Sequence, residues 1–319
     1  MLLYFLLRAG VFADAADIKR YKSMSNDQAA PSVHYLYNTY FFAGRWAPSL
    51  DLPGFRHMCS PEQILSADVL MVHLPSILST NTVNQLFRLR EIVPKRQIWV
   101  AESMESVVNY PQMDDPGFMS IFHFEASYRQ QADVWIPYIP SDFEIRCGAV
   151  NVARRGKQCC AFVSAAWDKS NRQAYIRELM GLMRVDSYGR FMRNKRLWFD
   201  KGEETKLRVL PKYTYTLAFE NSICPDYVTE KFFQPLMTGT VPIYLGASNI
   251  EEFAPGDDCY INATDFSSPA DLAAYLDSVD PARFHAWRMK ELRPSFRHKL
   301  DRLNRNWRNV LAHALIEVL

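Results

Sequence analysis

The stretch LAFENSICPDYVTEKFFQPLMTGTVPIYLG, residues 217–246, combines two strand-like segments with one helix-like segment. KYTYTLAF (212–219) is rich in β-forming residues, TEKFFQPLMTG (229–239) has a helical pattern that closes on Gly239, and VPIYLG (241–246) predicts a second strand. Pro242 predicts an edge strand or the first position of a strand, because proline donates no ladder hydrogen bond. This order of elements indicates an α/β unit with a parallel sheet.

The loop between the first strand and the helix, residues 220–226, is the predicted ligand-binding segment, because ligands bind beyond the carboxyl ends of strands in open α/β sheets. Asp226 is the expected N-cap of the helix. Lys231 follows in the opening turns, where a cation opposes the helix dipole, so an anion held there by Lys231 and the helix amides is expected. Tyr227, Glu230 and Lys231 fall at the helical spacing i, i+3 and i+4. One helix face would then offer a ring, a carboxylate and a cation to a base, a ribose diol and a diphosphate.

An ordinary Glu-Lys pair beside a phenylalanine core is the structural alternative for the same helix. Phe232, Phe233 and Leu236 supply that core face in either case. Polar and aromatic residues, however, gather within twelve positions around the strand end: Glu220, Asn221, Tyr227, Glu230 and Lys231. This density favours a functional site.

Outward from this stretch, strand-like and helix-like patterns alternate in two series. The first series predicts strands over 33–40, 67–74, 96–101 and 132–139 and a helix over 82–92. The second predicts a strand over 158–166, a helix over 171–183, the unit above, a helix over 268–279 opened by a Ser268-x-x-Asp271 cap, and a long amphipathic helix after Pro294. A break at 140–157 divides them, so we predict one α/β domain over 1–150, a second over 151–295 and a C-terminal helix over 296–319.

Composition excludes several classes of protein. The 319 residues suggest about two domains of roughly 100–200 residues each, and 37 Lys and Arg against 35 Asp and Glu argue against a nucleic-acid binder. No CxxC pair occurs among the six cysteines, and adjacent Cys159 and Cys160 are expected to be buried thiols on opposite faces of a strand.

The first apolar run stops at Arg8 after seven residues, which leaves a first strand, a clipped signal anchor or an incomplete start open. No later stretch predicts a membrane span, so the chain as written reads as soluble.

The motifs of several nucleotide-binding classes are missing. The chain contains no GxGxxG, no GxxxxGK[ST] and no Asp-x-Asp, so neither a dinucleotide fingerprint, a P-loop nor a metal-holding acidic pair is predicted. A diphosphate would then be held by Arg, Lys and helix amides. Arg172, at the start of the helix after strand 158–166, is the candidate, with a solvated surface arginine as its alternative.

At this point the chain resembles the α1,3/4-fucosyltransferases. FENSICPDYVTEKFF, GTVPIYLG and NIEEFAP are similar to the donor-binding signature of that family, with Asp-Tyr, Thr-Glu-Lys and Gly-x-Val-Pro at its spacing. SMESVVNYP (103–111) and SYRQQADVWIPY (127–138) resemble two segments of the family's acceptor domain. SAAWDKSNRQAYIRELM (164–180) resembles the segment that carries the diphosphate arginine, and SYG (187–189) follows in place.

The resemblance implies a fold and a reaction. The fold is the GT-B arrangement, two Rossmann-like doubly wound α/β domains with a cleft between them. The reaction is the inverting transfer of L-fucose from GDP-fucose to a GlcNAc hydroxyl of a glycan or glycoprotein acceptor, in an α1,3 linkage, and a single displacement needs no covalent nucleophile. No cofactor is required, with Mn²⁺ or Mg²⁺ at most stimulatory, because the Asp-x-Asp pair is missing.

By position, the resemblance also assigns residue roles. Glu105 matches the general base, with Glu102 three residues earlier as the competing candidate, and Glu220 matches an acidic residue that stabilises charge near the fucose. The donor contacts carried over are Arg172, Tyr188, Asn221, Tyr227, Glu230 and Lys231, and no metal ligand is expected.

Two features bear on the acceptor and the location. SMESxxNY is closer to the plant-type core α1,3-fucosyltransferases, and the family's paired histidines stand here as His73-Leu74. Family members are single-pass Golgi proteins with a lumenal catalytic domain, which implies a Golgi location and a membrane anchor that is not complete in this sequence. Asn262-Ala263-Thr264 is a glycosylation sequon compatible with the lumen. A GT-B glycosyltransferase with another nucleotide-sugar donor, and an inactive carbohydrate-binding relative, stay open as alternatives.

Overall fold

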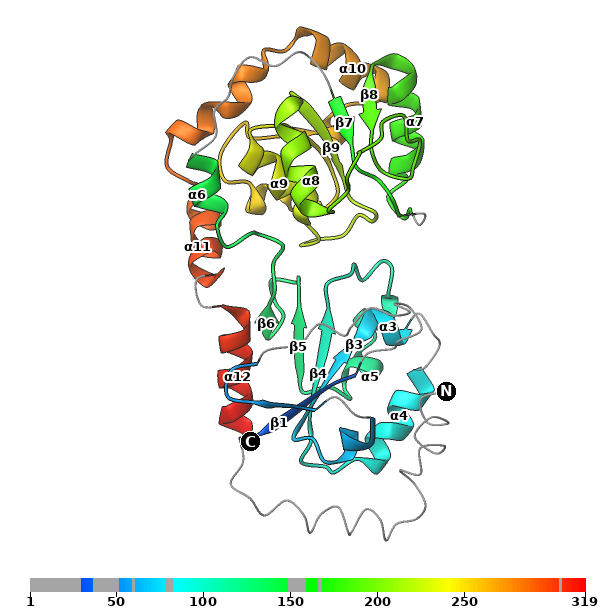
Figure 1. Cartoon of the computed structure of the whole chain (residues 1–319), viewed down its shortest axis with the longest axis vertical. Helices are drawn as coiled ribbons and strands as arrows, with labels where there is room; N and C mark the ends of the chain where they lie inside the picture. The colour runs from blue at the N-terminus through cyan, green and yellow to red at the C-terminus, as the bar shows by residue number, and fades with distance from the viewer. Residues whose placement is uncertain are drawn as a thin grey trace. The chain divides into compact units, whose positions relative to one another are not determined.

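The computed structural model describes residues 30–36, 52–58, 61–78, 83–148, 159–165, 168–303 and 306–319 (Figure 1). The chain forms two compact units, one of Met1–Ile136 with Arg305–Leu319 and the other of Pro137–Asn304. The predicted apolar run before Arg8 and the residue Cys59 lie outside the described residues.

The first unit is built on a parallel sheet whose described strands run in the order β2-β1-β3-β4-β5-β6. The strands are Ser32–Leu36 (β1), Arg56–Met58 (β2), Val69–His73 (β3), Ile98–Ser103 (β4), Phe124–Ser127 (β5) and Val134–Trp135 (β6). The helices are Pro61–Leu65 (η1), Leu74–Leu78 (α3), Val83–Ile92 (α4), Pro111–Asp114 (η2), Pro116–Met119 (α5) and Trp307–Val318 (α12).

The central strands β3 and β4 begin with continuous apolar runs because both of their faces are covered. Val69 belongs to a core that includes Leu311 and Leu315 of α12. Its neighbour Leu70 belongs to a second core that includes Leu86 of α4. Successive residues of β3 therefore serve opposite layers, as the two-residue period of a strand requires.

The second unit contains another parallel sheet, with the described strands in the order β11-β10-β9-β7-β8. The strands are Cys159–Ala161 (β7), Val185–Ser187 (β8), Tyr215–Phe219 (β9), Val241–Leu245 (β10) and Ile261–Asn262 (β11). The α-helices are Phe143–Gly148 (α6), Arg172–Leu182 (α7), Glu203–Val209 (α8), Glu230–Thr238 (α9), Pro269–Ser278 (α10) and Pro294–Leu303 (α11). The 3-10 helices are Leu210–Lys212 (η3), Ile250–Phe253 (η4), Ala263–Asp265 (η5) and Pro281–Met289 (η6).

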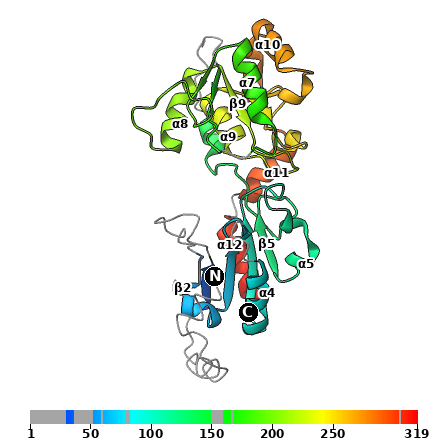
Figure 2. The same ribbon diagram turned by 90° about the vertical axis from the view of Figure 1, so that its right-hand side faces the viewer.

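Helices cover both faces of this sheet as well. Cys159 and Ala161 pack with residues of α7 and α10, whereas Cys160 packs with residues of α8 and η3. Figure 2 shows α8 and α10 on opposite sides of β9. The predicted class, two doubly wound α/β units, is confirmed, and so is the prediction that Cys159 and Cys160 are buried thiols on opposite faces.

Local signals in the sequence explain several helix ends. Ser268 caps α10 by accepting a hydrogen bond from Asp271 N, as predicted. Gly239 ends α9 in the left-handed conformation, with φ of 73°, which glycine adopts without strain. No helix among the described residues is long and apolar enough to cross a membrane.

Two element predictions are wrong. β10 is an inner strand, because it pairs with both β9 and β11. β11 pairs only with Ile243 and Tyr244, so Pro242 precedes this ladder and the N–H that proline lacks is not needed for pairing with β11. The single helix expected after Pro294 is two helices, α11 and α12, and the side chain of Asn306 caps the second by accepting from Arg308 N at 3.1 Å.

The division between the units also differs from the boundaries expected from the sequence. The first unit ends at Ile136 rather than near 150, and residues 305–319 return to it. The physical reason is the apolar face of α12, which completes the first core with Leu311 and Leu315.

Candidate functional site

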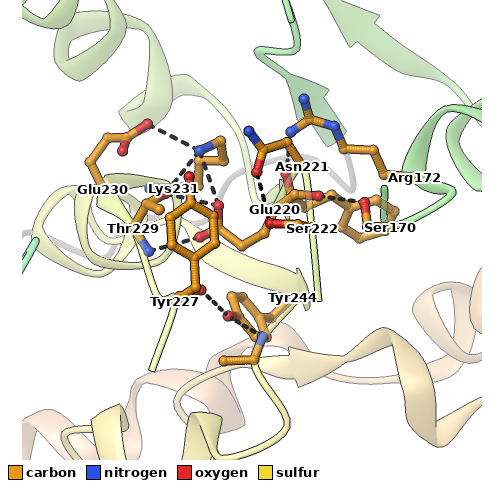
Figure 3. A network of polar contacts seen from close by, with 12 residues as sticks. Ser170, Arg172, Glu220, Asn221, Ser222, Tyr227, Thr229, Glu230, Lys231 and Tyr244 are labelled. Atoms are coloured by element: carbon orange, nitrogen blue, oxygen red, sulfur yellow. Dashed lines mark hydrogen bonds and ion pairs between the residues drawn. The ribbon is translucent and has the colours of Figure 1, made fainter. Parts of the chain in front are cut away.

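Two loops at the carboxyl end of the second sheet are tied together. One follows β7 and leads into α7, and the other follows β9 and leads into α9. Three hydrogen bonds join them: Lys169 N to the Asn221 carbonyl at 2.8 Å, Ser170 Oγ to the Glu220 carbonyl at 2.6 Å, and Arg172 Nη1 to the Phe219 carbonyl at 2.8 Å. Because β7 and β9 are neighbours, the two loops form one surface at the edge where α/β sheets bind ligands (Figure 3).

Arg172 begins α7 with its guanidinium inside the protein, so the alternative of a solvated surface arginine is wrong. Asp168 holds this helix start, because its carboxylate accepts from Arg172 N at 3.0 Å and from Gln173 N at 2.9 Å. Arg172 is 2% exposed, and burial lowers its pKa although Glu220 and Asp168 oppose that effect. Its Nε has no hydrogen-bond partner among the described residues. Buried donors are normally paired, so this N–H is suited to an anionic ligand.

Glu220 is the centre of the hydrogen-bond network on the other loop. Its carboxylate is 0% exposed and accepts from Thr229 N at 2.8 Å, from Thr229 Oγ1 at 2.9 Å and from Lys231 Nζ at 3.0 Å. Burial raises the pKa of Glu220, while Lys231 opposes that rise. The buried carboxylate thus fixes the position of the Lys231 ammonium.

Lys231 keeps part of its surface open. Nζ also donates to Thr229 Oγ1 at 2.8 Å and lies 3.4 Å from Glu230 Oε1, yet the side chain is 20% exposed. Burial disfavours the charge, but the carboxylates of Glu220 and Glu230 outweigh it and raise the pKa of Lys231. Burial also disfavours the negative charge of Glu230. The cations of Lys231 and Lys206 outweigh this effect, so the pKa of Glu230 is lowered. Lys231 is therefore a fixed, charged cation at the loop surface.

The predicted helix start is wrong, and with it one argument about the helix face. Thr229 is the N-cap of α9, with its side chain accepting from Lys231 N. Asp226 instead has φ of 66° and exchanges two hydrogen bonds with Asn249, at 2.9 and 2.8 Å. Tyr227 precedes the helix, so it does not share a helical face with Glu230 and Lys231. Its buried ring packs edge-to-face on Tyr138, with centroids 6.3 Å apart.

Asn221 lies on the same loop surface as Arg172 in Figure 3. Its Oδ1 accepts from Ser222 Oγ at 3.2 Å. Among the described residues, no hydrogen bond occupies its Nδ2, which gives the surface a neutral donor beside the two cations.

Tyr188 lies one strand further along the same edge, directly after β8. Its ring stacks on Phe162, with centroids 5.1 Å apart and planes at 13°, and its hydroxyl is 2.7 Å from the Tyr213 hydroxyl, which donates to Asp186. Gly189 allows this arrangement, because a Cβ there would lie 2.0 Å from the Val163 carbonyl oxygen. The close approach of the two backbones explains why glycine follows Tyr188.

The two candidate bases lie at the carboxyl edge of the first sheet. Glu102 is buried in β4 with Oε2 3.9 Å from His73 Nε2, and burial lowers the pKa of His73 to about 4. Glu105 follows the strand, is half-buried, and has its backbone fixed by two hydrogen bonds with Ser103 Oγ. Of the two carboxylates, that of Glu105 is the more accessible to an acceptor.

Sequence reasoning missed two residues of this polar network. Thr229 links Glu220 to Lys231, and its position before Glu230 is an N-cap signal that Asp226 obscured. Lys206, on α8, interacts electrostatically with Glu230, Lys231 and Glu220, and nothing in the segment around it signals this role. No group of three or more His, Cys, Asp or Glu in the described part of the chain is arranged to hold a metal ion.

Solved structures share this fold. A structure titled "Crystal Structure of alpha1,3-Fucosyltransferase with GDP-fucose" matches with a TM-score of 0.56 and 13% identity over 88% of this chain and 91% of that chain. A second, titled "Crystal Structure of alpha1,3-Fucosyltransferase", matches with a TM-score of 0.58 over 90% and 92%. The fold is that of a GT-B glycosyltransferase, as predicted.

Sequence comparisons give the family. Residues 152–309 match the model "Glycosyltransferase family 10 (fucosyltransferase) C-term". Alpha-(1,3)-fucosyltransferase B of Drosophila melanogaster is 31% identical over 242 residues, 70% of this chain and 53% of that protein. GDP-fucose protein O-fucosyltransferase 3 of Homo sapiens is 40% identical over 117 residues, 35% of this chain and 24% of that protein. The chain spans about half the length of these relatives or less, and it belongs to glycosyltransferase family 10.

Proposed function

We propose that the chain transfers L-fucose from GDP-fucose to an acceptor hydroxyl, with inversion at the anomeric carbon. The observation that carries the proposal is the joined loop surface after β7 and β9, where Arg172 Nε and Lys231 Nζ offer fixed positive charge at a ligand-binding edge. The relatives named α1,3-fucosyltransferase, and the structure titled with GDP-fucose, support this choice of donor.

The residues divide the donor between them. Arg172, Lys231 and the Nδ2 of Asn221 hold the diphosphate, because guanidinium, ammonium and amide donors match its oxygens. The side chain of Glu230 is 40% exposed and accepts from the ribose diol. Tyr188 and Tyr227 line the nucleoside.

The chemistry is a single displacement. Glu105 removes the proton from the acceptor hydroxyl while the oxygen of that hydroxyl forms a bond to the anomeric carbon of fucose. At the same time, the bond from the anomeric carbon to the β-phosphate oxygen breaks. GDP leaves with the bonding pair, and the cations of Arg172 and Lys231 stabilise the charge that develops on it. No covalent intermediate and no metal enter this scheme, and Mn²⁺ or Mg²⁺ is at most stimulatory.

Glu220 acts on the reaction through Lys231. Among the described residues its carboxylate accepts hydrogen bonds only from Thr229 and Lys231, so we assign it as a positioning residue. The expected stabilisation of charge near the fucose stays a prediction. The plant-type character of SMESxxNY also stays a prediction, because the relatives compared above are animal proteins. A Golgi lumenal location follows from the family alone.

The acceptor has two candidates. The first is a GlcNAc hydroxyl of a glycan or glycoprotein in an α1,3 linkage, in line with the name of the Drosophila relative. The second is a hydroxyl on a polypeptide, favoured by relatives named GDP-fucose protein O-fucosyltransferase 3, which match at 40% and 37% identity.

A transfer assay with radiolabelled GDP-fucose tests the proposal. Acceptors are GlcNAc-terminated N-glycans on an array and, in parallel, unglycosylated protein domains. GDP-mannose and UDP-sugars, each labelled on the sugar, are tested as alternative donors in separate reactions. Fucose transfer to an array glycan supports the first acceptor, and transfer to the bare domains supports the second. Transfer from another nucleotide sugar, or tight glycan binding without transfer from any donor, would overturn the function.

A further inference from the structure

Lys206 of α8 is a half-buried ammonium beside the donor loops. Its Nζ lies 5.8 Å from the centre of the Phe162 ring, and that ring stacks on Tyr188. Helix α8 also contacts α9, the helix that carries Glu230 and Lys231. Lys206 therefore shares the carboxyl edge of the sheet with the residues assigned to the donor.

No carboxylate among the described residues forms an ion pair or a hydrogen bond with Lys206. Burial lowers its pKa, and the carboxylates of Glu230 and Glu220 act in the opposite direction from further away. A partly buried cation without a close partner is unfavourable unless a ligand supplies acceptors. Phe162 attracts the charge with its ring face, but a ring offers no oxygen or nitrogen to accept a hydrogen bond.

The order of strands separates the diphosphate residues from Tyr188, whose ring stacks on the Phe162 ring that Lys206 approaches. The diphosphate residues follow β9 and β7, and Tyr188 follows β8, the next strand along. Neighbouring strands lie about 4.8 Å apart, so the ends of β9 and β8 are roughly 10 Å apart.

We propose that Lys206 reads the base of the donor nucleotide, with its ammonium donating to O6 and N7 of guanine beside the Phe162–Tyr188 stack. Guanine presents two acceptors on this edge, whereas adenine presents N7 and an amino donor at position 6 that would face the ammonium. Lys206 is then the residue that selects guanine over adenine. The inference rests on the proposed GDP-fucose donor and adds base selection to it.

The test is titration calorimetry of the whole chain with GDP, ADP and inorganic pyrophosphate. Lys206→Met keeps the length and apolar stem of the side chain and removes the charge. Lys212→Met, at an exposed position of the same unit, is the matched control. We expect Lys206→Met to lower the affinity for GDP about ten-fold or more while the affinities for ADP and pyrophosphate stay unchanged. Lys206→Arg should restore much of the preference for GDP.

Each other outcome has a distinct meaning. Equal weakening of GDP, ADP and pyrophosphate would place Lys206 on the phosphates and overturn the inference, and so would unchanged GDP binding in a folded Lys206→Met variant. A wild-type chain that binds no GDP would instead overturn the proposed function itself, before any variant is compared.

Discussion

Replacing Lys231 with alanine is expected to lower both the stability and the GDP affinity of the chain, for separate reasons. Nζ lies 3.0 Å from Glu220 Oε2 and 3.4 Å from Glu230 Oε1, and the Glu220 side chain has 0% exposure. Removing one partner of a buried pair leaves an uncompensated carboxylate, which typically lowers the free energy of unfolding by about 3–5 kcal/mol. Thr229 keeps two hydrogen bonds to Glu220, so we expect the lower end, about 3 kcal/mol.

A double variant separates the two effects. When Glu220→Gln is added to Lys231→Ala, the buried negative charge is gone, so most of the lost stability should return. GDP affinity should stay about ten-fold or more below wild type, because the charge-assisted contact to the diphosphate is still missing. Urea unfolding followed by circular dichroism measures the first quantity, and titration calorimetry with GDP measures the second. Arg208→Ala, which removes only an exposed pair with Glu204, is the control and should change stability by less than about 1 kcal/mol.

Two results would refute the reasoning. If Lys231→Ala unfolds within about 0.5 kcal/mol of wild type, Lys231 does not neutralise Glu220 as the short contact implies. If the restabilised double variant binds GDP as tightly as wild type, Lys231 has no part in holding the donor.

Four further predictions address the rest of the site. Glu105→Gln should lower the kcat of fucose transfer by about 10²–10⁴ with GDP binding unchanged, whereas Glu102→Gln should have a much smaller effect; a dead Glu102→Gln beside an active Glu105→Gln would reverse the assignment. Transfer should persist in EDTA, since side-chain cations carry the diphosphate charge, and complete loss of GDP binding on chelation would contradict this. Burial lowers the pKa of His73 from 6.5 to about 4, so below pH 6.5 the unfolded chain binds a proton that the folded chain does not. The free energy of unfolding, measured with urea, should therefore fall by about 3 kcal/mol between pH 6.5 and about 4. The His73→Gln variant should lack this loss. Gly189→Ala should lower the free energy of unfolding by about 1–3 kcal/mol and weaken GDP binding, because the added Cβ would meet the Val163 backbone. A thermal midpoint equal to that of wild type would argue against this contact.

The sequence predicted the parts of the fold that repeat a strong local pattern. The apolar runs of β3, β4 and β9 are continuous because helices cover both sheet faces, and such runs are easy to recognise. The strands β5 and β8 span four and three residues, too short for a periodic signal, and were missed. The start of α9 is harder to predict because Asp226 and Thr229 are both good caps, and only the hydrogen bond from Lys231 N decides between them.

The candidate site shows a similar limit. The residue types around Glu220 and Lys231 were found because they lie close together in the sequence. The enclosure of Glu220 depends on Thr229 and on Gly246 from the next strand, which only the folded chain brings into contact with it. Lys206 was missed because helix α8 approaches the donor loops from a segment whose own pattern is that of an ordinary surface helix.

The path of the chain between its two units has a consequence for how the protein can be taken apart. Topologically, the second unit is an insertion within the first, since Pro137–Asn304 interrupts a unit that resumes with α12. One continuous gene fragment can encode the inserted unit, whereas the host unit has to be reconnected, for instance by a linker from Ile136 to the start of α12. A stop codon placed just before α12 would therefore leave the inserted unit whole and strip Leu311 and Leu315 from the core of the other. The unit that begins first along this sequence is thus completed only by residues that follow the inserted unit.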